Sequence, residues 1–342
     1  MALASRAEQL AGSIIDADKR SRALHGLATA VTAAGDHERA AEIARSLADQ
    51  EAQAQALTDL ATAIAAAGDL DRAKALAIEA EQKIRSTTGE EDRKVHVSTE
   101  VATALAVIGD HDRAEEIARS LADSYWRSLA LTGLATAAAA AGRHAEAQAS
   151  AIRSGKMARS IVDPYRQPHA LIGVATAFAA AGDHKRAEAL IAQVRIVASP
   201  DEHARALIGL VGAATAAGDH PKAKALAARA EQVIQDIAEP YWRAKALVEL
   251  VAAVTAAGDH ERATALAARA EQTARSDSDP WSQAAALANL ADVVEPDRAR
   301  RLIAEALAVG RWTTPLEQIA RIDPATIRTF LDQFVTSWVP PS

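Results

Sequence analysis

Apolar residues recur along this chain with the period of an amphipathic helix. Leu24, Leu27 and Val31 follow the i, i+3, i+7 spacing and therefore share one face of a helix that ends near Gly35. A second helical pattern, HERAAEIARSLA, begins two residues after that glycine. The strict alternation of apolar and polar residues that is typical of strands is absent from the sequence. The pattern predicts an all-α chain in which the helices come in pairs.

One short string separates the two helices of each pair. It reads AAGDHERA at residues 33–40 and returns with small changes around seven glycines: Gly35, Gly68, Gly109, Gly142, Gly182, Gly218 and Gly258. Glycine ends helices because it adopts the left-handed conformation without strain, and Asp is a good N-cap for the helix that follows. The string predicts a helix A, a tight turn and a helix B. An eighth turn is expected at Glu295-Pro296-Asp297.

A hairpin of two such helices cannot bury its apolar face alone, so neighbouring hairpins must stack into an α-solenoid. Helix B is expected to be short after Gly35, Gly109 and Gly182 and longer by one or two turns after the other four glycines. The glycines recur every 33 to 41 residues, which is the period of repeat proteins.

The same positions carry a resemblance to the tetratricopeptide repeat family, from about residue 20 to 275. The first copy gives Leu24, Leu27, Ala28, Val31, Gly35, Asp36 and Ala40, and a late copy gives Leu247, Leu250, Val251, Val254, Gly258, Asp259 and Ala263. The chain departs from that family in replacing most bulky aromatics by aliphatic residues and in repeats longer than the usual ~34 residues. The expected fold is a right-handed α-solenoid of about seven to eight stacked tetratricopeptide-like repeats with a C-terminal helical cap.

Three regions are expected from these patterns. Residues 1–19 form an N-terminal capping helix, a helix B without its helix A, which is either a cap or the edge of a longer array. Residues 20–308 form the repeat array, and residues 309–342 form capping helices and a tail. In the last region Phe330, Phe334 and Trp338 make one helical stripe, which either seals the final repeat or docks another subunit.

Composition narrows the classes of partner. The chain has no Cys, which excludes disulfides, thiolate zinc sites and a Cys nucleophile. Its formal net charge of -7 disfavours nucleic acid, and no apolar run reaches the ~20 residues of a membrane span. We therefore expect a soluble, cytoplasmic protein without a nucleic-acid or membrane partner.

The repeated histidine of the turn string suggests metal binding, but the spacing disfavours it. His37, His111 and His184 each occur once per repeat, and packed helices lie about 8–10 Å apart, whereas zinc–nitrogen bonds are about 2 Å long. We also find no nucleophile elbow, phosphate-binding loop or dinucleotide-binding loop. The expectation is therefore no metal, no cofactor and no catalytic residue. An enzyme on an α-solenoid, such as a helical-repeat DNA glycosylase, would need a basic groove and a buried acid, and the sequence indicates neither.

The candidate binding groove lies on helix A, because helix A lines the concave surface in the resembling family. Positions six, ten and thirteen residues before each glycine supply its candidate residues: Thr58, Thr62, Thr99, Thr103, Thr132, Thr136, Ile172, Thr176, Arg205, Ile208, Lys245 and Val248. The first half would be mildly polar and the second half apolar with a basic margin. The alternative is that Thr and Ala are there because only small residues allow tight packing.

Two further series have open interpretations. Aromatic residues recur at the entry to helix A, at Tyr125, Trp126, Tyr165, Tyr241, Trp242 and Trp281. Packing between repeats is the favoured interpretation, and a ridge for a partner is the alternative. Cations follow each turn, at Arg39, Arg72, Arg113, Arg186, Lys222 and Arg262. We expect them to form a solvated ridge with local pairing to the capping Asp rather than a phosphate track.

The function that these patterns favour is a non-enzymatic scaffold that binds a protein or peptide on the concave helix-A face. The alternative is a sensor or oligomerisation arm of a larger signalling protein, and a homo-oligomer through the termini is possible on either view.

Overall fold

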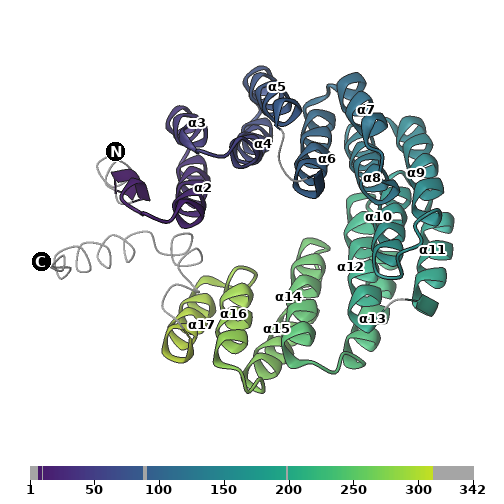
Figure 1. The fold of residues 1–342 in the computed structure, drawn as a ribbon. Helices are drawn as coiled ribbons and strands as arrows, with labels where there is room; N and C mark the ends of the chain where they lie inside the picture. The colour runs from purple at the N-terminus through teal and green to yellow at the C-terminus, as the bar shows by residue number, and fades with distance from the viewer. Residues whose placement is uncertain (1–6, 10, 88–90, 198, 311–342) are drawn as a thin grey trace, which may run out of the picture. The chain divides into compact units, whose positions relative to one another are not determined.

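The computed structural model describes residues 7–9, 11–87, 91–197 and 199–310, and every named element among them is a helix (Figure 1). The helices are α2 (Ala17–Ala33), α3 (His37–Ser46), α4 (Gln50–Ala66), α5 (Leu70–Ser86), α6 (Glu91–Ile108), α7 (His111–Ser120), α8 (Ser124–Ala140), α9 (His144–Arg159), α10 (Arg166–Ala180), α11 (His184–Val197), α12 (Pro200–Ala216), α13 (His220–Gln235), α14 (Pro240–Ala256), α15 (His260–Arg275), α16 (Pro280–Ala291) and α17 (Pro296–Val309).

The predicted turns are confirmed in backbone detail. All seven motif glycines have positive φ, from +73° to +101°. At the turn between α14 and α15, the Gly258 N–H donates to Thr255 O at 2.9 Å and the Asp259 N–H donates to Val254 O at 3.1 Å, which is the Schellman pattern. The Asp259 side chain then accepts from the Arg262 N–H and begins α15. Asp therefore closes one helix with its backbone and opens the next with its carboxylate.

The structure divides into two compact units, and the boundary lies between Ala187, the last residue of unit 1, and Glu188, the first residue of unit 2. In unit 1 the A helices form one layer in which each helix packs on the next, in the order α2, α4, α6, α8 and α10. The B helices α3, α5, α7 and α9 form a second layer beside it (Figure 1). In unit 2 α12, α14 and α16 pack in the same way, each paired with its own helix B. These stacked hairpins confirm the prediction of an all-α fold built from helix-turn-helix repeats.

The core of each repeat combines alanine with a few large aliphatic residues. In α4, Ala54 and Ala61 are fully buried beside Leu57 and Ile64, which are also fully buried. Alanine lets helices approach closely, and the leucines and isoleucines supply most of the buried apolar area. The small aromatic content is therefore sufficient for a packed repeat interior.

Helix B is short after Gly35 and Gly109 and long after Gly68, Gly142, Gly218 and Gly258, as the sequence predicts, whereas α11 after Gly182, predicted to be short, is close in length to the long helices. Helices α3 and α7 have 10 residues, whereas α5 has 17 and α9, α13 and α15 have 16 each; α11 has 14. The eighth hairpin turns at Glu295, which precedes α17. Residues 311–342, with Phe330, Phe334 and Trp338, lie outside the described part of the chain. Within the described part, no helix combines the length and apolarity needed to cross a bilayer.

Four of the loops that lead from helix B into the next helix A share a second capping device. The Gln53 side chain donates to Leu47 O, Gln167 donates to Ile161 O at 2.7 Å, and Arg243 donates to Ile237 O at 2.7 Å. Arg127 makes the same contact with Leu121 O at 2.7 Å. Each long polar side chain reaches back six residues to a carbonyl that helix B leaves without a helical partner. The device fixes where α4, α8, α10 and α14 begin.

Candidate partner-binding surface

Part of the groove predicted on helix A is inaccessible, which corrects that prediction. Thr58, Thr99, Ile208 and Val248 all stand ten residues before a turn glycine, and each is at most 8% exposed. Consecutive A helices pack directly on one another, so this row lies between neighbouring helices. A partner cannot reach these four side chains without separating the repeats.

The threonines serve the packing between A helices. The Thr58 hydroxyl donates to Ala54 O at 2.7 Å, and Thr103 donates to Thr99 O at 3.0 Å, so both turn back to their own helix. A Cβ at Gly133 of α8 would come within 2.9 Å of Thr103 Cγ2, so that glycine makes room for the threonine. The same four-residue back-bond is made by Thr62, Thr99 and Thr176, whereas Thr136 bonds a carbonyl three residues back and Thr132 bonds Ser154 of α9. These contacts support the alternative interpretation, that small residues are required here for tight packing.

The remaining predicted groove residues are at least partly accessible. They are Thr62, Thr103, Thr132, Thr136, Ile172, Thr176, Arg205 and Lys245. Arg205 and Lys245 stand thirteen residues before their glycines, one helical turn nearer to the start of helix A than the buried row. The accessible part of helix A therefore includes its first turns, where the sequence changes most from one repeat to the next.

In unit 1 the starts of α2, α4 and α6 line an open cavity of about 680 Å³. Its polar lining consists of Ser21, Arg22, His25, Asp49, Glu51, Gln55, Arg93 and His96. Ala48, Ala52 and Val97 form the apolar part of the wall.

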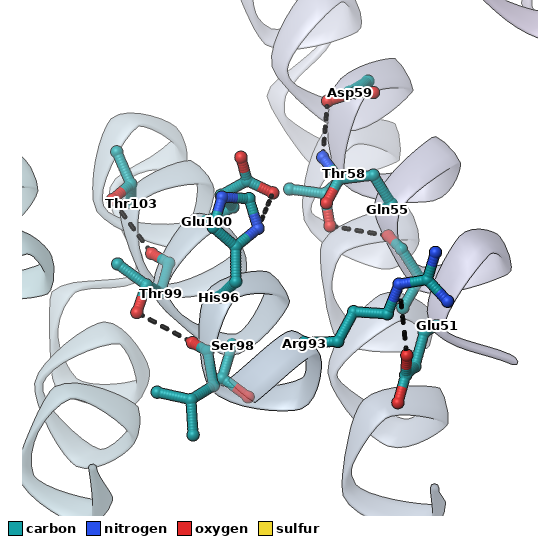
Figure 2. A network of polar contacts seen from close by, with 12 residues as sticks. Glu51, Gln55, Thr58, Asp59, Arg93, His96, Ser98, Thr99, Glu100 and Thr103 are labelled. Atoms are coloured by element: carbon teal, nitrogen blue, oxygen red, sulfur yellow. Dashed lines mark hydrogen bonds and ion pairs between the residues drawn. The ribbon is translucent and has the colours of Figure 1, made fainter. Parts of the chain in front are cut away.

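A polar network runs from this cavity along α4 and α6 (Figure 2). Arg93 Nε lies 3.6 Å from Glu51 Oε2, and the Glu51 side chain is only 5% exposed. Gln55 donates to Asp59 Oδ1 at 3.2 Å, so two residues of α4 that are one turn apart hold each other. Within α6, His96 Nδ1 is 3.7 Å from Glu100 Oε2, four residues further along the helix.

Burial changes the ionisation of two carboxylates in this network. Partial burial raises the pKa of Asp59, although His25, whose Nε2 is 3.5 Å from the Asp59 carboxylate, opposes the effect. Burial also raises the pKa of Glu100, and the nearby Asp59 adds to that rise while His96 opposes it. Both groups therefore lose their negative charge at a higher pH than exposed carboxylates do.

An aromatic cluster continues the surface on α8 and α10. The rings of Tyr125 and Trp126 pack edge to face with centroids 5.0 Å apart, and the His96 ring meets Trp126 at 5.2 Å. The Tyr125 hydroxyl is 3.2 Å from His169 Nδ1, and the Arg166 guanidinium lies over the Tyr125 ring at 5.3 Å. Trp126 also packs against the hydrophobic core. Here the favoured interpretation of the aromatics, packing between repeats, holds.

For three other aromatics that interpretation is wrong. Tyr165 is 80% exposed, Trp281 is 56% exposed and Trp242 is 47% exposed. Trp242 packs edge to face with Tyr241, and the Lys245 ammonium lies 5.2 Å from the Trp242 ring centroid. Unit 2 therefore presents two exposed indoles at the starts of α14 and α16, which contact each other as neighbouring A helices.

Comparisons with known proteins return weak structural matches. No family model matches the chain, and no curated protein matches it. Solved structures that match include BtubC (BKLC) from P. vanneervenii, at 18% identity over 58% of this chain and 88% of that one, with a TM-score of 0.37. A Rap protein complexed with Competence and Sporulation Factor matches at 15% identity over 78% of this chain and 77% of that one, with a TM-score of 0.36. A signal-transduction ATPase with a tetratricopeptide repeat sensor, from Pyrococcus horikoshii, matches at 16% identity with a TM-score of 0.33.

That last match covers 92% of this chain and 49% of the ATPase. At these scores the matches carry no argument about function, and the fold assignment rests on the hairpins described above. Stacked A and B helices joined by Gly-Asp turns decide it. The chain is an all-α array of stacked helix-turn-helix repeats.

The B helices of the repeat array are joined by ion pairs between repeats, which corrects the expected pairing of the cation row. Arg113 reaches Glu81 at 3.0 Å, Lys222 reaches Glu188 at 2.9 Å and Arg262 reaches Glu231 at 2.5 Å. Arg39 and Arg72 likewise reach Glu8 and Glu38, and only Arg186 of the row pairs with its own capping Asp183. Side chains at this position are long enough to reach a carboxylate that precedes them by about one repeat in the chain.

The sequence contains a signal for these ion pairs between B helices, which the sequence analysis did not use. The long B helices α5, α13 and α15 each contain the string Ala-Glu-Gln, and its glutamates are Glu81, Glu231 and Glu271. Glu271 accepts from Arg298 of α17 at 2.7 Å, so the eighth hairpin joins in the same way. The string recurs where a long helix B must pair with the next one.

The turn histidines of the repeat array occupy the first position of helix B. His37, His111, His184, His220 and His260 all begin such helices, as does His144. His111 contacts Arg143 of the next turn, and burial together with that guanidinium lowers the pKa of His111. Among the described residues, no three His, Asp or Glu side chains gather in a geometry that fits a metal ion.

Proposed function

We propose that this repeat array is a non-enzymatic scaffold that binds a protein or peptide along the first turns of its A helices. We call this region the helix-A start surface, and we define it by its accessible side chains: Arg22, His25, Gln55, Arg93, His96, Tyr125 and Trp126 in unit 1, and Arg205, Trp242, Lys245 and Trp281 in unit 2. The exposed indoles of Trp242 and Trp281 support the proposal most strongly, because Trp is among the residues that dominate protein interfaces.

The other faces of the repeats have fewer features that a specific partner would need. The turns repeat nearly the same string, and the charged residues of the B helices are largely engaged in ion pairs between repeats. The helix-A start surface, in contrast, changes from Gln55 to His96 to Lys245 at equivalent positions. Specificity is a difference in affinity built from local contacts, so a surface that varies from repeat to repeat suits an irregular ligand.

Site-specific photo-crosslinking tests this proposal. A photoreactive residue is placed at Gln55 or Trp242 on the helix-A start surface, and at Gln82 or Ile152, which are exposed on B helices, as matched controls. The intact chain is then irradiated in extract from its source organism. We expect one discrete adduct at Gln55 or Trp242 and none at the control positions. Adducts confined to Gln82 and Ile152 would contradict the proposal.

A further inference from the structure

We propose that the exposed indoles of unit 2, Trp242 and Trp281, bind residues 324–339 of this same chain until a partner displaces them. We call residues 324–339 the C-terminal segment. This inference rests on the proposed function, because it names what occupies the unit 2 part of the helix-A start surface when no partner is bound. The C-terminal segment lies outside the described part of the chain, and its sequence predicts what it can bind.

The docking surface consists of two large apolar side chains on adjacent helices. Trp281 is 56% exposed in the first turn of α16, and Trp242 is 47% exposed in the first turn of α14. The two helices contact each other, and packed helices lie about 8–10 Å apart. One segment can therefore contact both first turns, and exposed apolar surface of this kind marks an interaction site.

The C-terminal segment has the sequence of an amphipathic helix. Asp323 and Pro324 repeat the pair that begins α16, where Asp279 is the N-cap and Pro280 is the first helical residue. Apolar residues then follow a helical period: Ile327, Phe330, Leu331, Phe334, Val335 and Trp338. The residues between Phe334 and Trp338 on the other face are polar. A helix that is apolar on one face only must bury that face against another element.

The described chain ends beside the docking surface. Helix α17 ends at Val309, and Gly310 packs against the first turn of α16. A Cβ at Gly310 would overlap Ala284 Cβ and would lie 3.5 Å from Pro280 O. Because Pro280 directly precedes Trp281, the chain leaves the described repeats beside the turn that carries this exposed indole.

The residues that follow Gly310 are sufficient to bring the C-terminal segment onto both indoles. Residues 311–323 form the connection, and a flexible chain of that length has an end-to-end distance of about 20 Å, which exceeds the spacing of adjacent helices. A short tether also holds its ligand at an effective concentration of about millimolar, so the chain's own segment is favoured over a second copy at micromolar protein. The C-terminal segment then acts as a tethered competitor of the partner.

Photo-crosslinking within the purified full chain tests this inference. The photoreactive residue p-benzoylphenylalanine replaces Phe330, and mass spectrometry identifies the peptides that are joined to the C-terminal segment. We expect crosslinks to the first turns of α14 and α16 within the monomer. The same probe at Thr336, on the polar face of the predicted helix, is the matched control and should crosslink to neither turn.

Variants of the chain that carries the probe at Phe330 sharpen the test. Phe334→Asp should lower the crosslinking yield about tenfold, since burial of one phenylalanine favours association by about that factor, whereas Thr336→Asp should leave the yield unchanged. On the docking surface, Trp281→Ala should lower the yield by a similar factor. Tyr165→Ala, which removes an exposed ring of unit 1, should have no effect. Circular dichroism checks that every variant is folded.

Crosslinks to other parts of the chain, no crosslink, or equal yields in the variants and their controls would overturn the inference. Crosslinks found only in dimers would also overturn it, because the occupant would then be a second copy. Photo-crosslinking in extract with the probe at Trp242 separates this failure from failure of the proposed function. A partner adduct at Trp242 without any contact from Phe330 would leave the proposed function standing and remove the tethered competitor.

Discussion

The string Tyr-Trp-Arg occurs at residues 125–127 in unit 1 and again at residues 241–243 in unit 2. Both copies begin a helix A, and in both the arginine donates to the carbonyl six residues before it, at Leu121 and Ile237. The aromatic rings differ in their surroundings. Trp126 packs against the core, whereas Trp242 is 47% exposed. The local string determines the cap, and the neighbouring helices determine whether the indole is buried.

The sequence differences that cause this contrast lie on adjacent helices. In unit 1 His96 of α6 and His169 of α10 contact the rings of Trp126 and Tyr125. In unit 2 the string DPWSQAA of α16 replaces DPYRQPH of α10, so Ala285 stands where His169 would. Within the copies themselves, Lys245 replaces Leu129 and lies over the indole. In unit 2 the string therefore lacks a ring equivalent to His169 and gains the cation Lys245, and its tryptophan is exposed instead of packed on the core.

The largest expected effect is a difference in stability between variants at a buried position and at an exposed position of α14. Val248→Asp should cost more than about 3 kcal/mol of stability, because an unpaired carboxylate would be buried between A helices. The matched control Lys245→Asp, one turn earlier, should cost below about 1 kcal/mol. Urea denaturation followed by circular dichroism measures both. Similar midpoints for the two variants would show that the Val248 position is accessible after all.

The next effect compares the two tryptophans directly. Trp126→Ala should cost about 2–3 kcal/mol, because it removes a side chain that packs on the core. Trp242→Ala should cost below about 1 kcal/mol, since only an exposed ring and its contact with Lys245 are lost. The same urea experiment applies, and it would count against the account if Trp242→Ala proved the more destabilising change.

Both units contain the same Gly-Asp turn between helix A and helix B, and a substitution of its glycine gives a third prediction. Gly258→Val should cost about 1–3 kcal/mol, because Gly258 has φ +80° and a β-branched residue is strained there. Ala257→Val, at the preceding residue with φ -75°, should cost less. Thermal melting should broaden for Gly258→Val, since loss of one hairpin uncouples its neighbours. Overlapping melting curves would refute this role of the turn.

The smallest expected effect is a loss of stability at alkaline pH, which we attribute to Tyr125 in the first copy of the Tyr-Trp-Arg string. Burial raises the pKa of Tyr125, with Asp123 adding to the rise and Arg166 opposing it. The folded state then holds the phenol proton more tightly than the unfolded state, so stability falls as the pH rises above about 10. Tyr125→Phe should show a smaller fall in melting temperature between pH 9 and 11 than the wild type. An equal fall in the two proteins would contradict this role of Tyr125.

The turns could be predicted from sequence because their causes are local. Gly258 and Asp259 act on backbone groups within a few residues, and the same string repeats for the same reason. The burial of Ile208 and Val248 could not be predicted in this way, because it depends on how far apart consecutive A helices lie. The pairing of Arg113 with Glu81 also joins residues from different repeats. Helical periodicity assigns a face to each residue but does not show which neighbouring helix covers that face.

The central claim is that a partner contacts the first turns of the A helices. Hydrogen–deuterium exchange of the chain alone and with the partner captured by crosslinking tests it most directly. We expect slower exchange at the starts of α4, α6 and α8 in unit 1 or of α14 and α16 in unit 2, with B helices and Gly-Asp turns unchanged. Protection confined to the B helices or to the turns around Gly182 and Gly218 would contradict the account.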